Sequence, residues 1–345
     1  MAGKKVGMRT VGDVASWWLE RLEVDRNRSV KYRGSMASLM RKHVVPRVAK
    51  VLVAKVDRVV LDDKLVWPMH QEGLAPRTIQ KVMQGLRQAF AMAEEMNRLE
   101  SNPMAGITFR NFYKGKLKPK PAALSRIDLK ALVQHLVGVF NQDPLRGMLP
   151  LLMLAHGTRI GETLATRWAS VSLDERIWFI SAADQKSSRE HLLPLTVQVV
   201  GLFNRYRQAM PEVRLRAPWV FSVRGGARLA DTSAHALIRG ISGRAWSSHD
   251  LRKLMRDSLA DIGIDYMVAE RLINHSLGVT AETYLTKDDM ARRRDALERW
   301  HARLDECGFT EAHGVIVAVP ALLQNSAALD VPSVPAVSSA SMGGG

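Results

Sequence analysis

The chain has 345 residues, of which 46% are hydrophobic and 24% charged; this suffices for two globular domains and excludes a fibrous or wholly disordered protein. Its 50 lysines and arginines exceed its 34 aspartates and glutamates, and the resulting formal net charge of +16 predicts a polyanionic partner. The single cysteine, Cys307, excludes an intramolecular disulfide framework and a cysteine-built zinc site. No apolar run approaches the ~18 residues that span a bilayer. We therefore expect a cytoplasmic protein whose polyanion is nucleic acid and not a membrane.

Apolar residues recur at helical spacing through the first hundred positions. Residues 11–23 form one amphipathic pattern, and a second pattern around Met36–Val44 is expected to end at Pro46. A third apolar stretch follows at 59–69, and a long helix is expected over 76–99. Residues 1–103 are thus predicted to form a compact helical domain.

The excess of basic charge is concentrated in the first third of the chain. Residues 1–120 contain 24 basic and 11 acidic side chains, whereas the remainder contains 26 and 23. A solvated surface explains any single one of these charges, but their sum favours double-stranded DNA as the partner. The candidate DNA-binding residues are Arg41, Lys42, Arg77, Lys81, Arg87, Lys116 and Lys118.

Residues 104–124 interrupt the apolar periodicity. Lysines alternate with proline and glycine between Lys114 and Pro121, which is typical of a linker. A basic linker could cross a DNA backbone, although ordinary solubility explains the lysines equally well.

The second half of the chain mixes helices with a short hairpin. Helical patterns occur at 129–140 and 149–154, and the strands expected at 177–181 and 191–195 are joined by a polar segment. Helices then recur to about Glu306. We predict a mainly α fold with a small β-hairpin, a second domain over 125–306, and a disordered tail over 307–345 that is rich in Ala, Val, Ser and Pro.

The second domain contains an ordered set of residues suited to binding phosphate and transferring protons. Thr158-Arg159-Ile160-Gly161-Glu162 opens one helix, Lys186 lies in the polar hairpin, and His249-Asp250-Leu251-Arg252 opens another helix. His275 is followed nine residues later by Tyr284. The GxxxxGK[ST], GxGxxG and HExxH motifs are missing, so no nucleotide cofactor and no metal are expected.

This order of motifs resembles the tyrosine recombinase (phage integrase) family, over about residues 10–305 and most strongly over 149–285. The resemblance implies a helical core-binding domain and a mixed α/β catalytic domain that together clamp DNA. It also implies that the catalytic residues are Arg159, Lys186, His249, Arg252, His275 and Tyr284. One departure is that Ile273-Asn274-His275 stands where the family usually has Leu-Gly-His, so the local turn needs another explanation.

Elementary chemistry assigns roles to the same residues. Tyr284 would attack a backbone phosphorus and form a 3′-phosphotyrosyl ester, while Arg159 and Arg252 would hold the charge of the nonbridging oxygens. Lys186 suits protonation of the leaving 5′-oxygen, His249 acceptance of the tyrosine proton, and His275 a hydrogen bond to the phosphate. Glu162 is expected to be structural and to hold a neighbouring helix or arginine.

The predicted function is site-specific DNA recombination for a phage or other mobile element. The resemblance implies strand exchange through a Holliday junction within a homotetramer on specific core sites in the nucleoid, with accessory DNA-bending or directionality proteins as possible partners. The helix expected at 288–305 could dock on a neighbouring protomer or on its own domain. The alternatives are a type IB topoisomerase-like enzyme and a catalytically inactive DNA-binding regulator. The pairs Asp62-Asp63 and Asp288-Asp289 could suggest a two-metal nuclease but are interpreted as surface residues.

Overall fold

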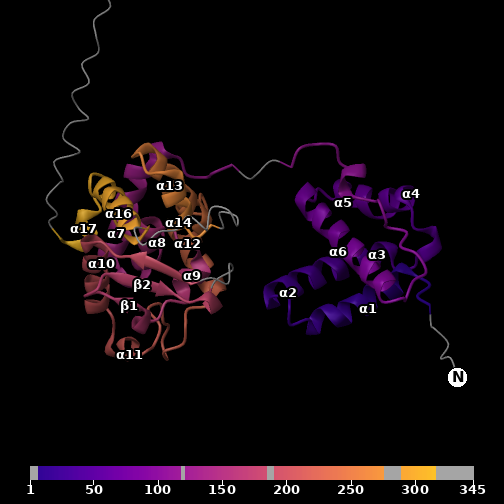
Figure 1. Ribbon diagram of the computed structural model, residues 1–345, viewed down its shortest axis with the longest axis horizontal. Coiled ribbons are helices and arrows are strands. Elements are labelled where there is room, and N and C mark those ends of the chain that lie inside the picture. The colour runs from indigo at the N-terminus through magenta and orange to yellow at the C-terminus, as the bar shows by residue number, and fades with distance from the viewer. Residues whose placement is uncertain (1–6, 118–120, 185–189, 276–288, 316–345) are drawn as a thin grey trace, which may run out of the picture. The chain divides into compact units, whose positions relative to one another are not determined.

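The computed structural model describes residues 7–117, 121–184, 190–275 and 289–315. The chain divides into two compact units, with the boundary between Lys120 and Pro121 (Figure 1). Across the described residues, none of the helices combines the length and the apolar character that crossing a bilayer requires.

The first unit is entirely helical in its regular elements and is built around α6 (Pro76–Glu95), whose apolar face is buried along its whole length. Helices α1 and α2 pack against α6. The elements are α1 (Val11–Val24), α2 (Val30–Leu39), a π-helix (Met40–Val44), α3 (Val45–Val48), α4 (Arg58–Leu61), a second π-helix (Asp62–Val66), α5 (Trp67–Gln71) and α6 (Pro76–Glu95), with 3₁₀ turns at Val53–Lys55 and Phe109–Asn111.

The expectation that Pro46 ends a helix is wrong. The helix widens into a π-helix over Met40–Val44 and then continues through Pro46 to Val48. Proline lacks an N–H group and its ring crowds the preceding turn, which leaves carbonyl groups without their usual donors. The guanidinium of Arg47 donates to the carbonyls of Lys42 and His43, each at 3.2 Å, and so compensates.

The second unit surrounds α8 (Pro144–His156), a helix whose last ten residues are all buried. Helices α7, α9, α10, α13 and α16 all contact α8. The helices are α7 (Leu129–Gln142), α8 (Pro144–His156), α9 (Ile160–Leu164), α10 (Val197–Gln208), α11 (Glu212–Leu215), α12 (Asp231–Ile241), α13 (Ser248–Asp261), α14 (Tyr266–Leu272), α16 (Asp289–Asp305) and α17 (Thr310–His313), with 3₁₀ turns at Arg126–Asp128, Trp168–Ser170 and Ala182–Asp184.

The predicted hairpin is confirmed and belongs to a three-stranded antiparallel sheet in the order β1-β2-β3. The strands are β1 (Val171–Ser172), β2 (Ile177–Ile180) and β3 (His191–Pro194), and Phe179 pairs with Leu192. Trp178 of β2 is fully buried. The fold is therefore mainly α with a small sheet, as the sequence predicts.

The linker expected at 104–124 needs correction at both ends. Met104, Ile107 and Phe109 are buried in the first core, and the ring of Tyr113 stacks on that of Phe109 with centroids 5.4 Å apart. On the other side, Leu124 is part of the second core. The sequence signal failed because only a few apolar residues, without a helical period, anchor this segment.

The tail expected at 307–345 is partly wrong. Cys307, Phe309 and Ala312 are buried, and the guanidinium of Arg205 donates to the carbonyls of Glu311 and Ala312 at 2.6 and 2.7 Å. The chain therefore packs on its own unit to the end of α17, and residues 316–345 lie outside the described residues.

Helix α16 packs on its own unit, which is one of the two alternatives left open by the sequence. Leu297, Trp300 and Leu304 are buried, and the indole N–H of Trp300 donates to the carbonyl of Leu154 in α8 at 3.3 Å. Helix α16 also contacts β3 and α14.

Candidate active site

Arg159 lies at the N-cap of α9, where Glu162 holds it in place. The Glu162 carboxylate accepts hydrogen bonds from the Arg159 backbone N–H at 2.9 Å and from its guanidinium at 2.6 Å. The Glu162 side chain is only 4% exposed, whereas 32% of the Arg159 side chain remains exposed. The expected structural role of Glu162 is thus confirmed, and part of the Arg159 side chain is left accessible.

Arg252 projects from the second turn of α13 and is almost completely buried. Its guanidinium donates to the carbonyl of Gly157 at 2.5 Å and to the carbonyl of Ile273. Gly157 ends α8 in the left-handed region at φ +62°, and a Cβ atom there would lie 2.9 Å from side-chain atoms of Ile273 and Met255. Glycine therefore allows the chain to turn where its carbonyl must meet Arg252.

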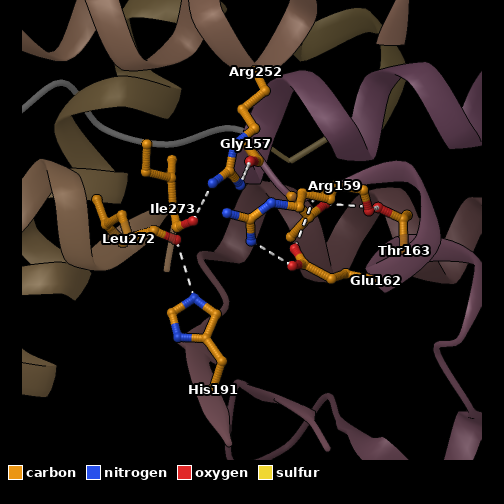
Figure 2. A network of polar contacts seen from close by, with 9 residues as sticks. Gly157, Arg159, Glu162, Thr163, His191, Arg252, Leu272 and Ile273 are labelled. Carbon is orange, nitrogen blue, oxygen red and sulfur yellow. Dashed lines mark hydrogen bonds and ion pairs between the residues drawn. The ribbon is translucent and has the colours of Figure 1, made fainter. Parts of the chain in front are cut away.

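The two guanidinium groups lie beside each other, as Figure 2 shows. Burial, and after it the positive charge of Arg159, lowers the pKa of Arg252 to about 10, although the carboxylates of Glu162 and Glu270 act in the opposite direction. With this pKa, Arg252 is still a cation at neutral pH. A bound anion would relieve their repulsion, so the pair forms a prepared site for an oxyanion.

His249 lies in the first turn of the same helix as Arg252. A capping box between Ser247 and Asp250 fixes the start of α13, with the Ser247 hydroxyl 2.6 Å from the Asp250 carboxylate. Partial desolvation, followed by the charges of Lys253 and Arg252, lowers the pKa of the exposed His249. A neutral imidazole at this position can accept a proton.

His275 follows α14, and its placement depends on an unusual turn. Asn274 adopts φ +51°, the Asn274 N–H donates to the carbonyl of Arg271 at 3.0 Å, and the His275 N–H donates to the carbonyl of Glu270 at 2.9 Å. This pair of bonds is the Schellman motif, which normally has glycine at the left-handed position. Asparagine is the residue that best replaces glycine there, so the departure from Leu-Gly-His preserves the turn.

The structure also adds a carboxylate to the site. The Glu270 carboxylate lies 2.5 Å from Nδ1 of His275 and accepts a hydrogen bond from Arg256. The sequence motifs include neither Glu270 nor Arg256, because these residues lie on α14 and α13 and no short motif links them.

A buried histidine supports the segment between Arg252 and His275. Nε2 of His191, on β3, lies 3.1 Å from the carbonyl of Leu272. Burial lowers the pKa of His191 to about 4, so the ring is neutral and donates its Nε2–H to that carbonyl. The carbonyls of Leu272 and Ile273 are therefore both occupied, by His191 and Arg252 respectively (Figure 2).

Four of the six predicted catalytic residues fall in the described part of the chain: Arg159 at the start of α9, His249 and Arg252 on α13, and His275 in the turn after α14. Lys186 and Tyr284 lie outside the described residues. Within the described ranges, no group of three or more metal-binding side chains occurs.

The acidic pairs differ in their environment. Asp62 and Asp63 are exposed, as expected. Asp289 is not a surface residue: it forms ion pairs with Arg271 at 2.7 Å and Arg293 at 2.8 Å, and its side chain is 16% exposed. Asp288 lies outside the described residues.

The candidate DNA-binding side chains in the first unit are exposed. Arg77, Lys81 and Arg87 lie along α6, whereas Arg41 is engaged in an ion pair with Glu23. Lys42 and Lys116 are exposed, and Lys118 lies outside the described residues.

Comparison with known proteins finds a family model and proteins of similar sequence. Residues 125–290 match the model of the phage integrase family. Tyrosine recombinase XerD of Pseudomonas aeruginosa is 29% identical over 254 residues, which cover 70% of this chain and 80% of that protein. Prophage integrase IntA of Escherichia coli is 21% identical over 82% of this chain and 67% of that protein.

Solved structures share the same architecture. The Tn1549 transposon integrase in complex with a circular intermediate DNA aligns with a TM-score of 0.66 at 16% identity, over 85% of this chain and all of that chain. A lambda integrase dimer bound to a COC′ core site aligns with a TM-score of 0.61 at 14% identity, over 81% of this chain and 77% of that chain. A lambda integrase tetramer bound to a Holliday junction aligns with a TM-score of 0.58 at 14% identity, over 79% of this chain and 77% of that chain. Residues 125–290 thus form a phage integrase family domain, and the similar sequences are named tyrosine recombinases and integrases.

Proposed function

We propose that this chain is a site-specific DNA recombinase that cuts and rejoins strands through a covalent bond to Tyr284. The observation that carries the proposal is the paired guanidinium site of Arg159 and Arg252, which fixed acceptors hold beside each other. A phosphodiester has one negative charge spread over two nonbridging oxygens, and two planar cations match it.

The reaction exchanges one ester for another. The Tyr284 oxygen attacks the phosphorus and gives its proton to His249, whose lowered pKa favours the neutral base. The bond from phosphorus to the 5′-oxygen breaks, and Lys186 supplies the proton for the leaving hydroxyl. Arg159 and Arg252 hold the developing charge while His275 hydrogen-bonds a nonbridging oxygen.

The biological setting follows from the same proposal. Among the proteins that share this fold, the Tn1549 transposon integrase is in complex with a circular intermediate DNA, and a lambda integrase tetramer is bound to a Holliday junction. We extend this to the present chain as strand exchange in a homotetramer, for a phage or other mobile element, in the cytoplasm at the nucleoid. Accessory DNA-bending or directionality proteins are part of the proposal.

The first test concerns the nucleophile. Tyr284→Phe removes one hydroxyl group, so DNA binding is expected to persist while covalent adducts disappear. The measurement is capture of protein–DNA adducts from a library of nicked duplexes that contains host–element junctions, followed by sequencing of the captured DNA. Tyr266→Phe is the matched control, because Tyr266 is 62% exposed and is the nearest rival in sequence. If adducts persist in Tyr284→Phe and vanish in Tyr266→Phe, the nucleophile is Tyr266 and not Tyr284.

The second test concerns the general acid. Sulfur in place of the bridging 5′-oxygen leaves almost without a proton, so this strand should largely restore cleavage by Lys186→Ala. Arg159→Ala and Arg252→Ala should be restored much less, since their charges act on the nonbridging oxygens. Single-turnover cleavage of both strands by the three variants provides the comparison. Equal restoration of all three variants, or none for Lys186→Ala, would remove Lys186 from the proton transfer.

A further inference from the structure

A series of side-chain contacts that begins on α13 holds the imidazole of His275. Arg256, on α13, donates its Nε–H to one oxygen of the Glu270 carboxylate, and Nδ1 of His275 lies 2.5 Å from the other oxygen. The exposed fractions are 18% for Arg256, 11% for Glu270 and 43% for His275. The contacts thus connect two largely buried side chains, Arg256 and Glu270, to the accessible imidazole of His275.

The far end of this series of contacts is itself anchored. The Arg256 guanidinium lies 5.0 Å from the centroid of the Tyr266 ring, in a cation–π arrangement, while Glu270 belongs to α14. Arg256 therefore has little freedom to turn away from Glu270.

The carboxylate of Glu270 is ionised at neutral pH. Burial acts to raise its pKa, but the hydrogen bonds and charges of Arg256 and His275 outweigh burial, and the pKa lies below its ordinary value. An ionised carboxylate can only accept hydrogen bonds, so the proton in the short contact belongs to Nδ1 of His275. Nε2 is then the ring nitrogen left to meet a substrate.

The backbone around His275 does not depend on this carboxylate. The His275 N–H donates to the carbonyl of Glu270, and the carbonyls of Leu272 and Ile273 accept from His191 and Arg252. The side chain of Glu270 therefore has a separable task, which is the orientation of the imidazole ring.

We propose that Glu270 is a positioning residue: anchored by Arg256, it fixes the proton on Nδ1 of His275 and directs Nε2 to the scissile phosphate. This inference rests on the proposed function, because it takes His275 as the residue that contacts the phosphate. It is the same arrangement by which a carboxylate fixes the tautomer and orientation of a histidine in other hydrogen-bonded dyads.

Two variants separate anchoring from charge. Glu270→Ala frees the ring and is expected to slow single-turnover cleavage by about tenfold to a hundredfold, since misplacing a group by about 1 Å has an effect of this size. Glu270→Gln offers one oxygen to two donors, Arg256 and His275, and is expected to fall between wild type and Glu270→Ala. Glu212→Ala, which removes an exposed carboxylate paired with Arg216, is the matched control and should change nothing.

A double-mutant cycle distinguishes positioning from a structural effect. In a His275→Ala background, Glu270→Ala should cost less than about twofold in cleavage rate, because its target is gone. The same loss with and without His275 would overturn the inference, as would wild-type cleavage by Glu270→Ala. The substrate is the duplex that the capture experiment recovers with wild-type protein. If the wild-type protein forms no covalent adduct in that experiment, the result counts against the proposed function.

A spectroscopic measurement tests the tautomer without DNA. In the full chain labelled with ¹⁵N-histidine, and with His275 assigned through His275→Ala, Nδ1 should be protonated and its proton shifted strongly downfield. The downfield proton should be lost in Glu270→Ala. A wild-type His275 that is protonated on Nε2 alone would overturn the inference, whatever the cleavage rates.

Discussion

At the scale of single residues, the site depends on two arginines: backbone carbonyls accept the hydrogen bonds of Arg252, and the Glu162 carboxylate accepts those of Arg159. Arg252 is almost completely buried, yet the Gly157 and Ile273 carbonyls accept two of its hydrogen bonds. A buried cation is costly unless its surroundings compensate it, and here backbone dipoles provide part of that compensation. The side chain is therefore in position before DNA arrives, and its charge remains available to a phosphate.

Three of the buried histidines, His156, His191 and His301, lie in the second unit. His156 and His301 are fully buried, with ring centroids 5.5 Å apart, and His191 lies on β3. His301 donates its Nε2–H to the carbonyl of Ala155 at 2.9 Å, and its Nδ1 accepts from the Thr196 hydroxyl at 2.7 Å. Burial lowers the pKa of His156 to about 4 and that of His301 to about 3.

These histidines predict a loss of stability in acid. Each has a lower pKa in the folded state than in the unfolded chain, so the unfolded chain binds more protons between about pH 6.5 and pH 4. The stabilisation is complete above pH 6.5 and is lost as the pH falls towards 4, by roughly 1 kcal/mol per histidine for each pH unit within this window. Urea unfolding followed between pH 7 and pH 5 should show this decline.

The control variant for the acid experiment is His235→Gln, because His235 in α12 is only half-buried. It should retain the wild-type dependence, whereas His301→Gln should flatten it. A free energy of unfolding that stays constant between pH 7 and pH 5 would contradict neutral buried histidines.

At the scale of elements, the turn after α14 shows how one substitution preserves geometry. The left-handed position costs most residues about 1–2 kcal/mol, and only glycine and asparagine occupy it readily. Asn274 at φ +51° therefore ends α14 as glycine would and delivers His275 beside Glu270.

This geometry predicts the effects of two substitutions at Asn274. Asn274→Gly should leave the cleavage rate within about twofold of wild type, because glycine satisfies the same φ angle. Asn274→Val should destabilise the turn by about 1–2 kcal/mol and lower cleavage, since a β-branched residue is strained there. Thermal unfolding and single-turnover cleavage measure the two effects, and an active Asn274→Val with unchanged stability would contradict the interpretation.

The elements also show where sequence reasoning succeeds. Apolar periodicity predicts α6 and α7 well because each has one long buried face. The periodicity could not predict that helices pass through Pro46 and Pro68, since the compensating π-helices and the Arg47 guanidinium become visible only in three dimensions. The ordered motif predicts Arg159, Arg252 and His275, but not Glu270, whose partners come from a separate helix and from the turn beyond its own.

At the scale of the whole molecule, charge and chemistry are divided between the two units. The paired arginines lie in the second unit, whereas residues 1–120 hold most of the excess positive charge. In the first unit, the exposed face of α6 presents Arg77, Lys81 and Arg87 among glutamines, and no acidic residue occurs in this helix before Glu94. A face of cations and amides without carboxylates is suited to a phosphate backbone.

The last prediction concerns this division of charge. The affinity falls as salt rises, and each cation that neutralises a phosphate makes the slope of log affinity against log salt steeper by about 0.9. A double Lys81→Gln, Arg87→Gln variant should therefore make this slope shallower by up to about 1.8. Arg41→Gln should change the slope less, because this guanidinium already pairs with Glu23. Arg216→Gln, an exposed pair in the second unit, is the control and should keep the wild-type slope. Fluorescence anisotropy with a duplex of about 40 bp, read over a range of salt concentrations, gives all four slopes. If the α6 double variant retained the full slope, the DNA backbone would have to contact other cations of the first unit, and the basic face of α6 would be a solvated surface.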